Sequence, residues 1–563
     1  MIDKEDNPHN SSSSHKGTKR ESDESTESQP SKIVRTQSPV RDGMSDEAEG
    51  ATFAADEVTV LSVEADVSCR TEALLPSEIQ ELHELWQSGA SSEVLLADYL
   101  QKKMSKELPH SGNEPEMQKK IDEAKLTEWN TITAKHAGRL VLGEEAREVK
   151  HRFSHRIMGS RFVLTIKQEE DAPARTKARW CLQGHLDPDL SEKASSGDLQ
   201  SPTLSQVGRN LIFQLLASFQ WQMRLGDIRG AFLSAGDLPV KYKPLYARLP
   251  PGGIPGVPDN SLIEVLGHVY GLNDSPAAWY KKLCSELLDV GFERSRFDSC
   301  VFYMRENGKL TGVYGIHVDD SVTGGSGAKY EEALRKLQAK FEFRKWRVGD
   351  GDFCGANYVQ DPNTGEITMS QEKFAQKIKP LHFSKERLRM RESELNEKEI
   401  GCLRAINGSL NWLASQSRPD LATQVSFSQQ SFPRPTINDA LAANNAVRRA
   451  KQRADQTIRF RSIPSESLTL MCHSDAAFGN AKSGATQAGY MVSFTHSDMN
   501  SGKTCDWTPM FWKSCRLPRV VSSTLSAEAQ SMSLASSMCE WIALFLSEAM
   551  DGPWPPHVLE SQT

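Results

Sequence analysis

Three aspartates in two segments have the residue type and setting needed to bind metal ions. Asp227 lies in LGDIRGAFLSAGDL, and Asp319 and Asp320 lie in YGIHVDDSVTGG. Apolar and β-branched residues flank the Asp-Asp pair, which predicts a hairpin with two carboxylates at its tip, because a buried strand does not accept adjacent acids without compensation. Mg²⁺ provides such compensation and prefers carboxylate, phosphate and water oxygens. Taken alone, an Asp-Asp turn is more often a solvated hairpin tip.

Carboxylates of this kind support one type of chemistry when they converge. Two metal ions about 3.5–4 Å apart can activate an attacking hydroxyl and stabilise a leaving pyrophosphate in an in-line displacement. We therefore expect Asp227, Asp319 and Asp320 to meet in space and to hold two Mg²⁺ ions, with Mn²⁺ as an alternative.

A second pair of acids lies near the C-terminus. Asp475, in LTLMCHSDAAFGN, falls on an alternating strand, and AGYMVSF and PMFWKSC are typical of partner strands. The run that starts STLSAEAQ predicts a helix that places Glu528 inside an apolar stripe with Leu525, Met532, Ala535, Cys539, Ile542 and Leu546. An inward-facing acid needs a metal or a cation. The alternative is that Glu528 only occupies the first helical turn, where the dipole favours it.

The elements that position the first three acids follow from hydrophobic periodicity. Segments 161–167 and 177–182 are expected to be strands joined by a polar turn that contains proline, and residues 206–219 form a helical pattern. Trp221, Met223 and Leu225 then alternate as a strand that ends at Asp227. A helix should follow Pro276, with Ser275 as its N-cap. Residues 312–324 predict a strand, a turn and a strand, and a second α/β unit should begin near Leu468.

Composition limits the class of protein. The chain has 563 residues, with 38% hydrophobic and 25% charged residues, as in soluble globular proteins of several domains. No apolar run is long enough for a membrane span, and Met1 to Asn10 lacks the features of a secretory signal, so an intracellular protein is expected, cytoplasmic or nuclear. The ten cysteines show no zinc-ligand spacing.

The net charge of −7 is unevenly distributed. Residues 1–75 contain 8 Lys and Arg against 16 Asp and Glu, a local charge of −8, so the remaining residues sum to about +1. This leader is rich in Ser, Thr, Asp and Glu and is expected to be disordered. A neutral body is compatible with a basic groove formed by clustering.

Taken in order, the motifs resemble the reverse transcriptase and ribonuclease H region of copia-type LTR retrotransposon Pol polyproteins. The similar segments include KARW, LGDIRGAFL, VYGLNDSPAAWY, HVDD, GDFCGANYV and, further on, LRAINGSLNWLASQSRPDLATQVSFSQQ, within residues 125–546. The resemblance implies an α+β right-hand polymerase with fingers, palm and thumb or connection, followed by an incomplete ribonuclease H-like α/β domain. The expected parts are a disordered acidic leader (1–75), a helical segment (76–139), fingers and palm (140–358), thumb or connection (359–460) and a truncated ribonuclease H-like domain (461–563).

The resemblance also assigns roles to residues. Asp227 and Asp319 are the principal metal ligands and Asp320 the more peripheral acid, while Asp475 and Glu528 match the first two ribonuclease H metal ligands. The other implied roles concern substrates. Phe232 screens the sugar 2′-hydroxyl, Lys177 and Arg179 hold the triphosphate, Tyr270 and Gly271 shape the floor under the base pair, and Gly355 forms a primer-gripping turn where close backbone approach excludes a side chain. The alternatives are that Phe232 is a core residue and that the basic pair is a solvated strand face.

Three positions depart from the family pattern. His317 replaces a tyrosine two residues before the Asp pair, and Asn273 and Asp274 replace a Lys-Gln pair, which removes a cation. No third ribonuclease H aspartate is found before the end, so we expect that unit to be weak or inactive.

The function that these residues predict is RNA-directed DNA synthesis. The expected partners are an RNA template, a DNA primer, RNA-DNA hybrid and deoxynucleoside triphosphates, bound mainly through phosphates. The alternative is a catalytically decayed remnant that only binds nucleic acid.

Overall fold

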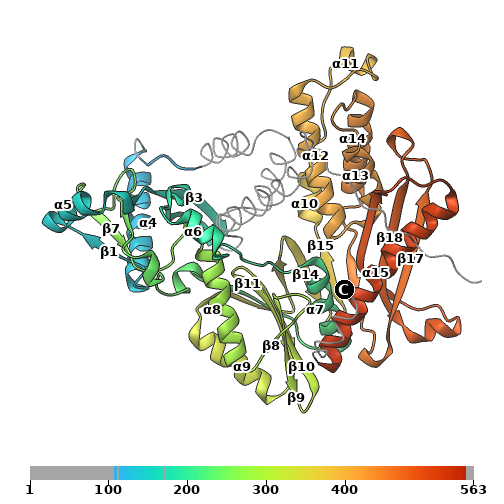
Figure 1. Cartoon of the computed structure of the whole chain (residues 1–563), viewed down its shortest axis with the longest axis horizontal. Helices are drawn as coiled ribbons and strands as arrows, with labels where there is room; N and C mark the ends of the chain where they lie inside the picture. The colour runs from blue at the N-terminus through green and yellow to red at the C-terminus, as the bar shows by residue number, and fades with distance from the viewer. Residues whose placement is uncertain (1–106, 111–112, 170–171, 553–563) are drawn as a thin grey trace, which may run out of the picture. The chain divides into compact units, whose positions relative to one another are not determined.

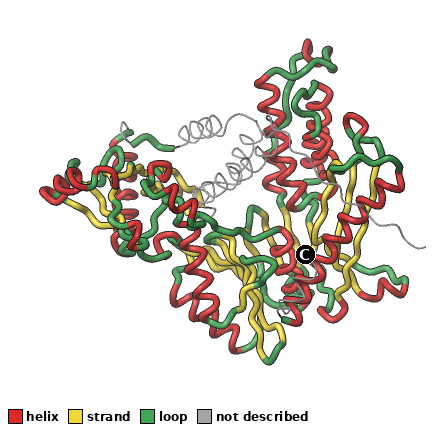
Figure 2. Tube along the Cα trace, viewed as in Figure 1, coloured by secondary structure: helices red, strands yellow, loops and turns green. Residues whose placement is uncertain are grey.

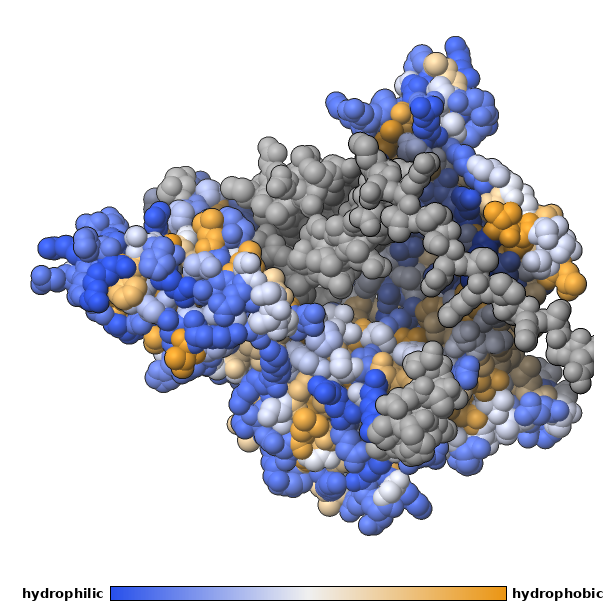
Figure 3. All heavy atoms as spheres, viewed as in Figure 1, coloured by the Kyte–Doolittle hydropathy of each residue, from blue (hydrophilic) through white to orange (hydrophobic). Residues whose placement is uncertain are grey.

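The computed structural model describes residues 107–110, 113–169 and 172–552, which form helices and mainly antiparallel sheets (Figures 1 and 2). The leader and the helices expected before residue 107 lie outside these residues. Within the described part of the chain, no helix is both long enough and apolar enough to cross a membrane. On the face drawn in Figure 3, hydrophilic residues cover most of the described surface and apolar residues form scattered areas.

The first described part combines one long helix with a small sheet and a hairpin. The helix α4 (Pro115–Ala134) begins with proline in its first turn and buries Trp129 and Ile132. The sheet has the order β1-β7-β6-β2. The elements in this part are β1 (Gly138–Val141), α5 (Gly143–Arg152), β2 (Ile157–Met158), the paired β3 (Ser160–Glu169) and β4 (Ala172–Leu182), α6 (Leu190–Ser195), β6 (Tyr246–Arg248) and β7 (Leu262–Val265).

A six-stranded sheet in the order β12-β5-β11-β10-β9-β8 carries the first acid cluster. Its strands are β5 (Arg224–Ile228), β8 (Glu293–Arg294), β9 (Val301–Glu306), β10 (Lys309–His317), β11 (Asp320–Gly325) and β12 (Phe343–Val348). Three helices cover it: α7 (Gln206–Ser218), α8 (Ser275–Asp289) and α9 (Ala328–Lys340).

Glycines on β10 show that α7 and α9 cover opposite faces of this sheet. A Cβ on Gly312 would lie 2.5 Å from the Tyr330 ring on α9, and a Cβ on Gly315 would lie 2.5 Å from Ile212 on α7. Residues three apart on a strand point to opposite faces. The sheet is therefore buried on both sides. The helix α7 is itself buried nearly all round, including its polar residues Arg209, Asn210 and Gln214.

The next part pairs a four-stranded sheet with a helical bundle. The sheet contains β13 (Asp350–Phe353), β14 (Ala356–Gln360), β15 (Ile367–Ser370) and β16 (Ile458–Phe460). The helices are α10 (Glu372–Lys377), α11 (Lys385–Arg389), α12 (Glu397–Gln416), α13 (Ala422–Gln429) and α14 (Ile437–Gln452), of which α12, α13 and α14 lie side by side (Figure 1). Capping boxes at Asn396 and Thr436 start α12 and α14 by satisfying backbone N–H groups.

The last described part is a three-stranded antiparallel sheet with one long helix. It consists of β17 (Leu468–Ala477), β18 (Gln487–His496), β19 (Trp507–Arg516) and α15 (Thr524–Asp551), and α15 packs on β17 and β18 (Figure 1). The expected strands of this unit are confirmed.

Most of the predicted elements around the sheet are present, and four details are corrected. The expected boundaries at 139/140 and 358/359 fall inside β1 and β14, because hydrogen-bonded strands continue across them. The N-cap of α8 is Asp274, and Ser275 is already helical. Residues 221–223 precede β5, which begins at Arg224.

The fourth correction concerns the apolar stripe of α15. Leu525 and Met532 are exposed, whereas the face that packs inward carries Ala527, Ser531, Ala535, Ile542, Phe545 and Ala549. Small residues occupy the first half of this face, so the predicted stripe is wrong at Leu525 and Met532, whereas its members Ala535 and Ile542 are buried as expected.

Candidate active site

The structure brings the three predicted palm acids together. Asp320 on β11 is the direct cross-strand partner of Asp227 on β5, and the Asp319 carbonyl accepts a hydrogen bond of 3.0 Å from the Ile228 N–H. Directly opposed residues of an antiparallel pair project to the same face, with Cα atoms about 4.5–5.5 Å apart. Asp227 and Asp320 therefore share one face, and Asp319 is in the adjoining turn.

The turn that carries Asp319 is tight and strained. His317 pairs with Asp320, so the loop contains only Val318 and Asp319. Val318 has φ +57°, a conformation that β-branched residues rarely adopt. The indole N–H of Trp279 on α8 donates to the Val318 carbonyl at 2.7 Å and holds the turn. The sequence reasoning missed this role of Trp279, although the residue lies in the quoted segment VYGLNDSPAAWY.

A cation that was not predicted contacts the first acid. Arg344 on β12 donates from Nε to the Asp227 carboxylate at 3.0 Å, and its Nη2 contacts the same oxygen. Burial lowers the pKa of Arg344, and the nearby positive charge of Arg179 lowers it further. The carboxylates of Asp227 and Asp319 outweigh both effects and raise the pKa above its ordinary value. Arg344 therefore lies near two of the three acids and near Arg179.

Two of the predicted substrate residues, Phe232 and Arg179, contact a third, Tyr270. The Phe232 ring is fully buried and meets the Tyr270 ring at 5.6 Å, and the Arg179 guanidinium lies 5.5 Å from the centre of the Tyr270 ring. Lys177, half-buried, is two residues before Arg179 on β4 and opposite Thr165. In this structure Phe232 is packed as a core residue, so a gating role for it stays a prediction.

Gly271 is required by its surroundings. It has φ +87°, and a Cβ there would lie 2.1 Å from the Leu182 carbonyl oxygen. The Leu182 N–H donates to the Tyr270 carbonyl at 2.9 Å. This contact joins the end of β4 to the segment before α8.

Gly355 forms the turn between β13 and β14, and its predicted contact with a primer stays a prediction. Its φ is +72°, and an added Cβ would meet only Trp412, at an ordinary 3.4 Å. Within the protein itself, the left-handed backbone is what favours glycine at this position.

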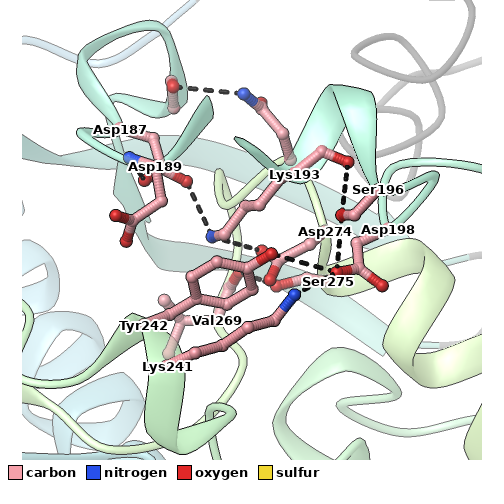
Figure 4. A network of polar contacts seen from close by, with 12 residues as sticks. Asp187, Asp189, Lys193, Ser196, Asp198, Lys241, Tyr242, Val269, Asp274 and Ser275 are labelled. Carbon is pink, nitrogen blue, oxygen red and sulfur yellow. Dashed lines mark hydrogen bonds and ion pairs between the residues drawn. The ribbon is translucent and has the colours of Figure 1, made fainter. Parts of the chain in front are cut away.

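Asp274 belongs to a buried polar network (Figure 4). The fully buried ammonium of Lys193 lies between Asp187, at 2.8 Å, and Asp274, at 3.1 Å. The Asn273 side chain donates to the Gly184 carbonyl at 3.1 Å. The Lys-Gln pair of the family pattern is absent at positions 273–274. Lys193 supplies a buried cation here, and it pairs with Asp274.

His317, at the end of β10, is buried near the cationic side chain of Arg209. Burial and the charge of Arg209 lower its pKa, so the imidazole is neutral near pH 7. Its ring centre lies 6.5 Å from that of Phe353 on β13. The departure from tyrosine at 317 therefore alters packing between the acid-bearing hairpin and the β13–β14 turn.

The second predicted acid pair is less closely defined. Asp475 is exposed on β17 and lines a depression with His473, Gly489, Ser514 and Thr423, whereas Glu528 is half-buried on α15 and does not line it. The Ser531 hydroxyl donates to the Asp475 carbonyl at 2.9 Å, which ties α15 to β17.

The acids of the first cluster fit magnesium in their chemistry, with one reservation. Three carboxylates on adjoining strands are hard oxygen donors of the kind that Mg²⁺ takes. In the described residues, however, no three His, Cys, Asp or Glu side chains are arranged as a ligand set, and Asp227 is bonded to Arg344. A metal ion bound at the same oxygen of Asp227 would therefore have to displace Arg344.

Comparison with known proteins shows which family the segment that carries this site resembles. Residues 146–383 match the family model "Reverse transcriptase (RNA-dependent DNA polymerase)". This segment contains all three clustered acids. The chain thus carries a reverse transcriptase domain.

Curated relatives place that domain among mobile elements. The chain is 26% identical to the Retrovirus-related Pol polyprotein from transposon RE1 of Arabidopsis thaliana and 25% identical to that from transposon RE2, in each case over 70% of this chain and 26% of the relative. A putative transposon Ty5-1 protein of Saccharomyces cerevisiae is 24% identical over 45% of this chain and 83% of the relative. The chain is related to the Pol polyproteins of copia-type LTR retrotransposons, and it spans about a quarter of the length of the first two relatives.

Solved structures give weaker similarity. The foamy viral protease-reverse transcriptase in complex with double-stranded DNA superposes with a TM-score of 0.38 at 12% identity, over 69% of this chain and 56% of that one. Its complex with RNA/DNA hybrid gives 0.34 at 11% identity, over 68% and 43%.

Proposed function

We propose that residues 146–383 catalyse template-directed addition of deoxynucleoside triphosphates to a primer 3′ end, with RNA as a template. The observation that carries the proposal is the cross-strand pairing of Asp227 with Asp320 beside Asp319. When bound, a pair of Mg²⁺ ions would activate the attacking hydroxyl and neutralise charge on the leaving pyrophosphate. Asp227, Asp319 and Asp320 would hold the ions.

The surrounding residues would position the substrates. Arg179 lies near Arg344, which in turn contacts Asp227. Arg179 would pair with phosphate oxygens of the incoming nucleotide. Tyr270, fixed by Gly271, would form the floor beneath the base pair, and the Gly355 turn would contact the primer. Trp279 would keep the Asp319 turn in place during the reaction.

Primer extension tests this function directly. On poly(rA)/oligo(dT) with Mg²⁺, we expect synthesis by the unmodified chain and a loss of at least about 10³-fold in Asp319→Asn, because that change removes a charged ligand. Asp289→Asn, at the end of α8, is the matched control and should keep full activity. Duplex binding measured by fluorescence anisotropy should be unchanged in Asp319→Asn.

The same measurements separate this function from its alternative. Duplex binding without synthesis by the unmodified chain would show a remnant that only binds nucleic acid, and it would refute the enzymatic proposal.

A ribonuclease H-like role for residues 461–552 is a second proposal. Its support is the position of Asp475 on the first strand of an antiparallel sheet against which α15, with Glu528, packs. We expect weak cleavage of the RNA strand of a hybrid, since no three acidic or His and Cys side chains of the described residues form a metal-ligand set. Cleavage that survives Asp319→Asn but is lost in Asp475→Asn would assign the activity to this part.

A further inference from the structure

The edge strand β12 contains one residue more than its partner where it passes the acid cluster. Phe343 pairs with Ile228 on β5 and Lys345 pairs with Asp227, so Arg344 is the extra residue of a β-bulge. Bulges of this kind redirect a side chain and are frequent next to active sites. Here the bulge directs Arg344 onto Asp227.

The bulge is held in place by packing over a glycine. A Cβ on Gly226 would lie 2.8 Å from the Phe343 ring, so the missing side chain lets Phe343 lie against β5. Phe343 in turn meets the Trp346 ring at 4.9 Å. The residues on either side of Arg344 are thus anchored, while the Arg344 side chain itself remains one-third exposed.

The contact between Arg344 and Asp227 excludes a cation from the same oxygen. Two N–H groups of Arg344 converge on one carboxylate oxygen of Asp227, and Asp319 also acts on the guanidinium. A divalent ion bound by Asp227 and Asp319 would occupy the place where this positive charge now compensates them. Like charges at such short range repel strongly.

We propose that Arg344 is a positioning residue that acts as a latch on Asp227: it binds the carboxylate until a divalent cation displaces it, and so sets the affinity of the acid cluster for metal. The proposal rests on the proposed function, since it concerns the same three acids. Because partly exposed ion pairs are weak, the latch can be released by a cation. Without Arg344, the neighbouring carboxylates repel one another more strongly, so their affinity for a metal ion should rise.

Metal binding without nucleotide or turnover tests the latch. Mn²⁺ affinity would be measured by the loss of the free-ion electron paramagnetic resonance signal, for the unmodified chain and for Arg344→Gln. We expect Arg344→Gln to tighten Mn²⁺ binding at least about fivefold. Arg344→Lys keeps the charge but loses the planar fork, and it should lie between the two.

The matched control is Arg229→Gln, which removes an equal charge two residues from Asp227. Arg229 pairs with Glu342 at 2.8 Å, and both side chains are more than half exposed. Its removal should change Mn²⁺ affinity by less than about twofold, because solvent and salt screen it. Circular dichroism would establish folding of each variant, and if Arg344→Gln is unfolded, the comparison of Arg344→Lys with Arg229→Lys gives the result.

The outcomes distinguish the latch from the function on which it rests. If Mn²⁺ binding is lost in Asp227→Asn but unchanged or weaker in Arg344→Gln, the latch is refuted and the metal site stands. If the unmodified chain binds no Mn²⁺ that depends on Asp227, the metal site itself fails and the latch fails with it. The latch is supported if Arg344→Gln binds Mn²⁺ more tightly than the unmodified chain and Arg229→Gln does not.

Discussion

Lys193 shows how a single residue in this chain carries a large energetic consequence. Its ammonium is fully buried between the carboxylates of Asp187 and Asp274, which are themselves almost inaccessible. Burial lowers the pKa of Lys193, but Asp274 and Asp187 outweigh burial and raise it above its ordinary value of 10.5. A buried pair of this kind contributes little relative to apolar packing, but it becomes costly when one partner is removed.

Replacement of Lys193 by methionine should therefore destabilise the fold by about 3–5 kcal/mol, since two buried carboxylates lose their counter-charge. Chemical denaturation measures this difference. Lys281→Met is the control: Lys281 is 62% exposed and pairs with Asp198 at 3.2 Å, so its loss should cost less than about 1 kcal/mol. Equal losses of stability in Lys193→Met and Lys281→Met would contradict the burial of Lys193.

The stabilisation that Lys193 provides has a defined pH dependence. Because the folded pKa of Lys193 is raised, its contribution is fully present below the ordinary value of 10.5 and is lost as pH rises through the higher folded pKa. The difference between the unmodified chain and Lys193→Met should thus be constant around neutral pH and shrink only in strong alkali.

At the scale of elements, the junction between β4 and α8 fixes the floor beside the acids. Gly271 is left-handed and in contact with Leu182, and the following helix carries Trp279, which holds the Asp319 turn. A displacement of this junction would therefore move the acid-bearing hairpin as well, because α8 connects the two through Trp279.

Gly271→Ala should cost about 2–5 kcal/mol of stability, which combines the strain of a left-handed alanine with a clash against the Leu182 carbonyl. Gly308→Ala separates the two effects. Gly308 has φ +77° with no atom within 4 Å of an added Cβ, so only the strain of about 1–2 kcal/mol should be seen. Thermal unfolding measures both, and an equal loss would mean that the contact with Leu182 does not matter.

At the scale of the whole molecule, one hydrophobic cluster crosses the expected domain boundaries. It includes Leu211 on α7, Tyr358 on β14, Phe460 on β16, Val492 on β18 and Phe545 on α15. Polar contacts reinforce it: Asn210 donates to the Met510 carbonyl at 2.9 Å, and the buried Glu548 accepts from Ser295 and Arg296. Segments of the six-stranded sheet, of the β13–β16 sheet and of the last described part thus share one core, whereas the helices α10, α12, α13 and α14 form a cluster of their own.

Phe545→Ala should destabilise this shared core by about 3–5 kcal/mol. The control is Leu525→Ala on the same helix, whose side chain is 78% exposed, with an expected change within about 0.5 kcal/mol. If the core is shared, fluorescence and circular dichroism should follow one unfolding transition in Phe545→Ala. Two separate transitions would show that the C-terminal part folds independently.

The sequence by itself determined the local elements and the identity of the acids. Alternation in residues 312–324 and the apolar run 206–219 gave the right strands and helix, because period and turn residues are properties of a few neighbouring positions. For the same reason, Asp227, Asp319 and Asp320 were recognisable: a carboxylate between apolar strands is unusual wherever it occurs.

The tertiary structure alone decided which residues surround those acids. Arg344 lies 117 residues after Asp227, and its contact depends on a bulge that no local pattern specifies. Trp279, Lys193 and the inward face of α15 were likewise missed or misassigned, since each depends on a partner that is distant in the chain. Pairing register and burial are set by the packing of whole elements, so residue types show which groups can react, and only the fold shows which groups meet.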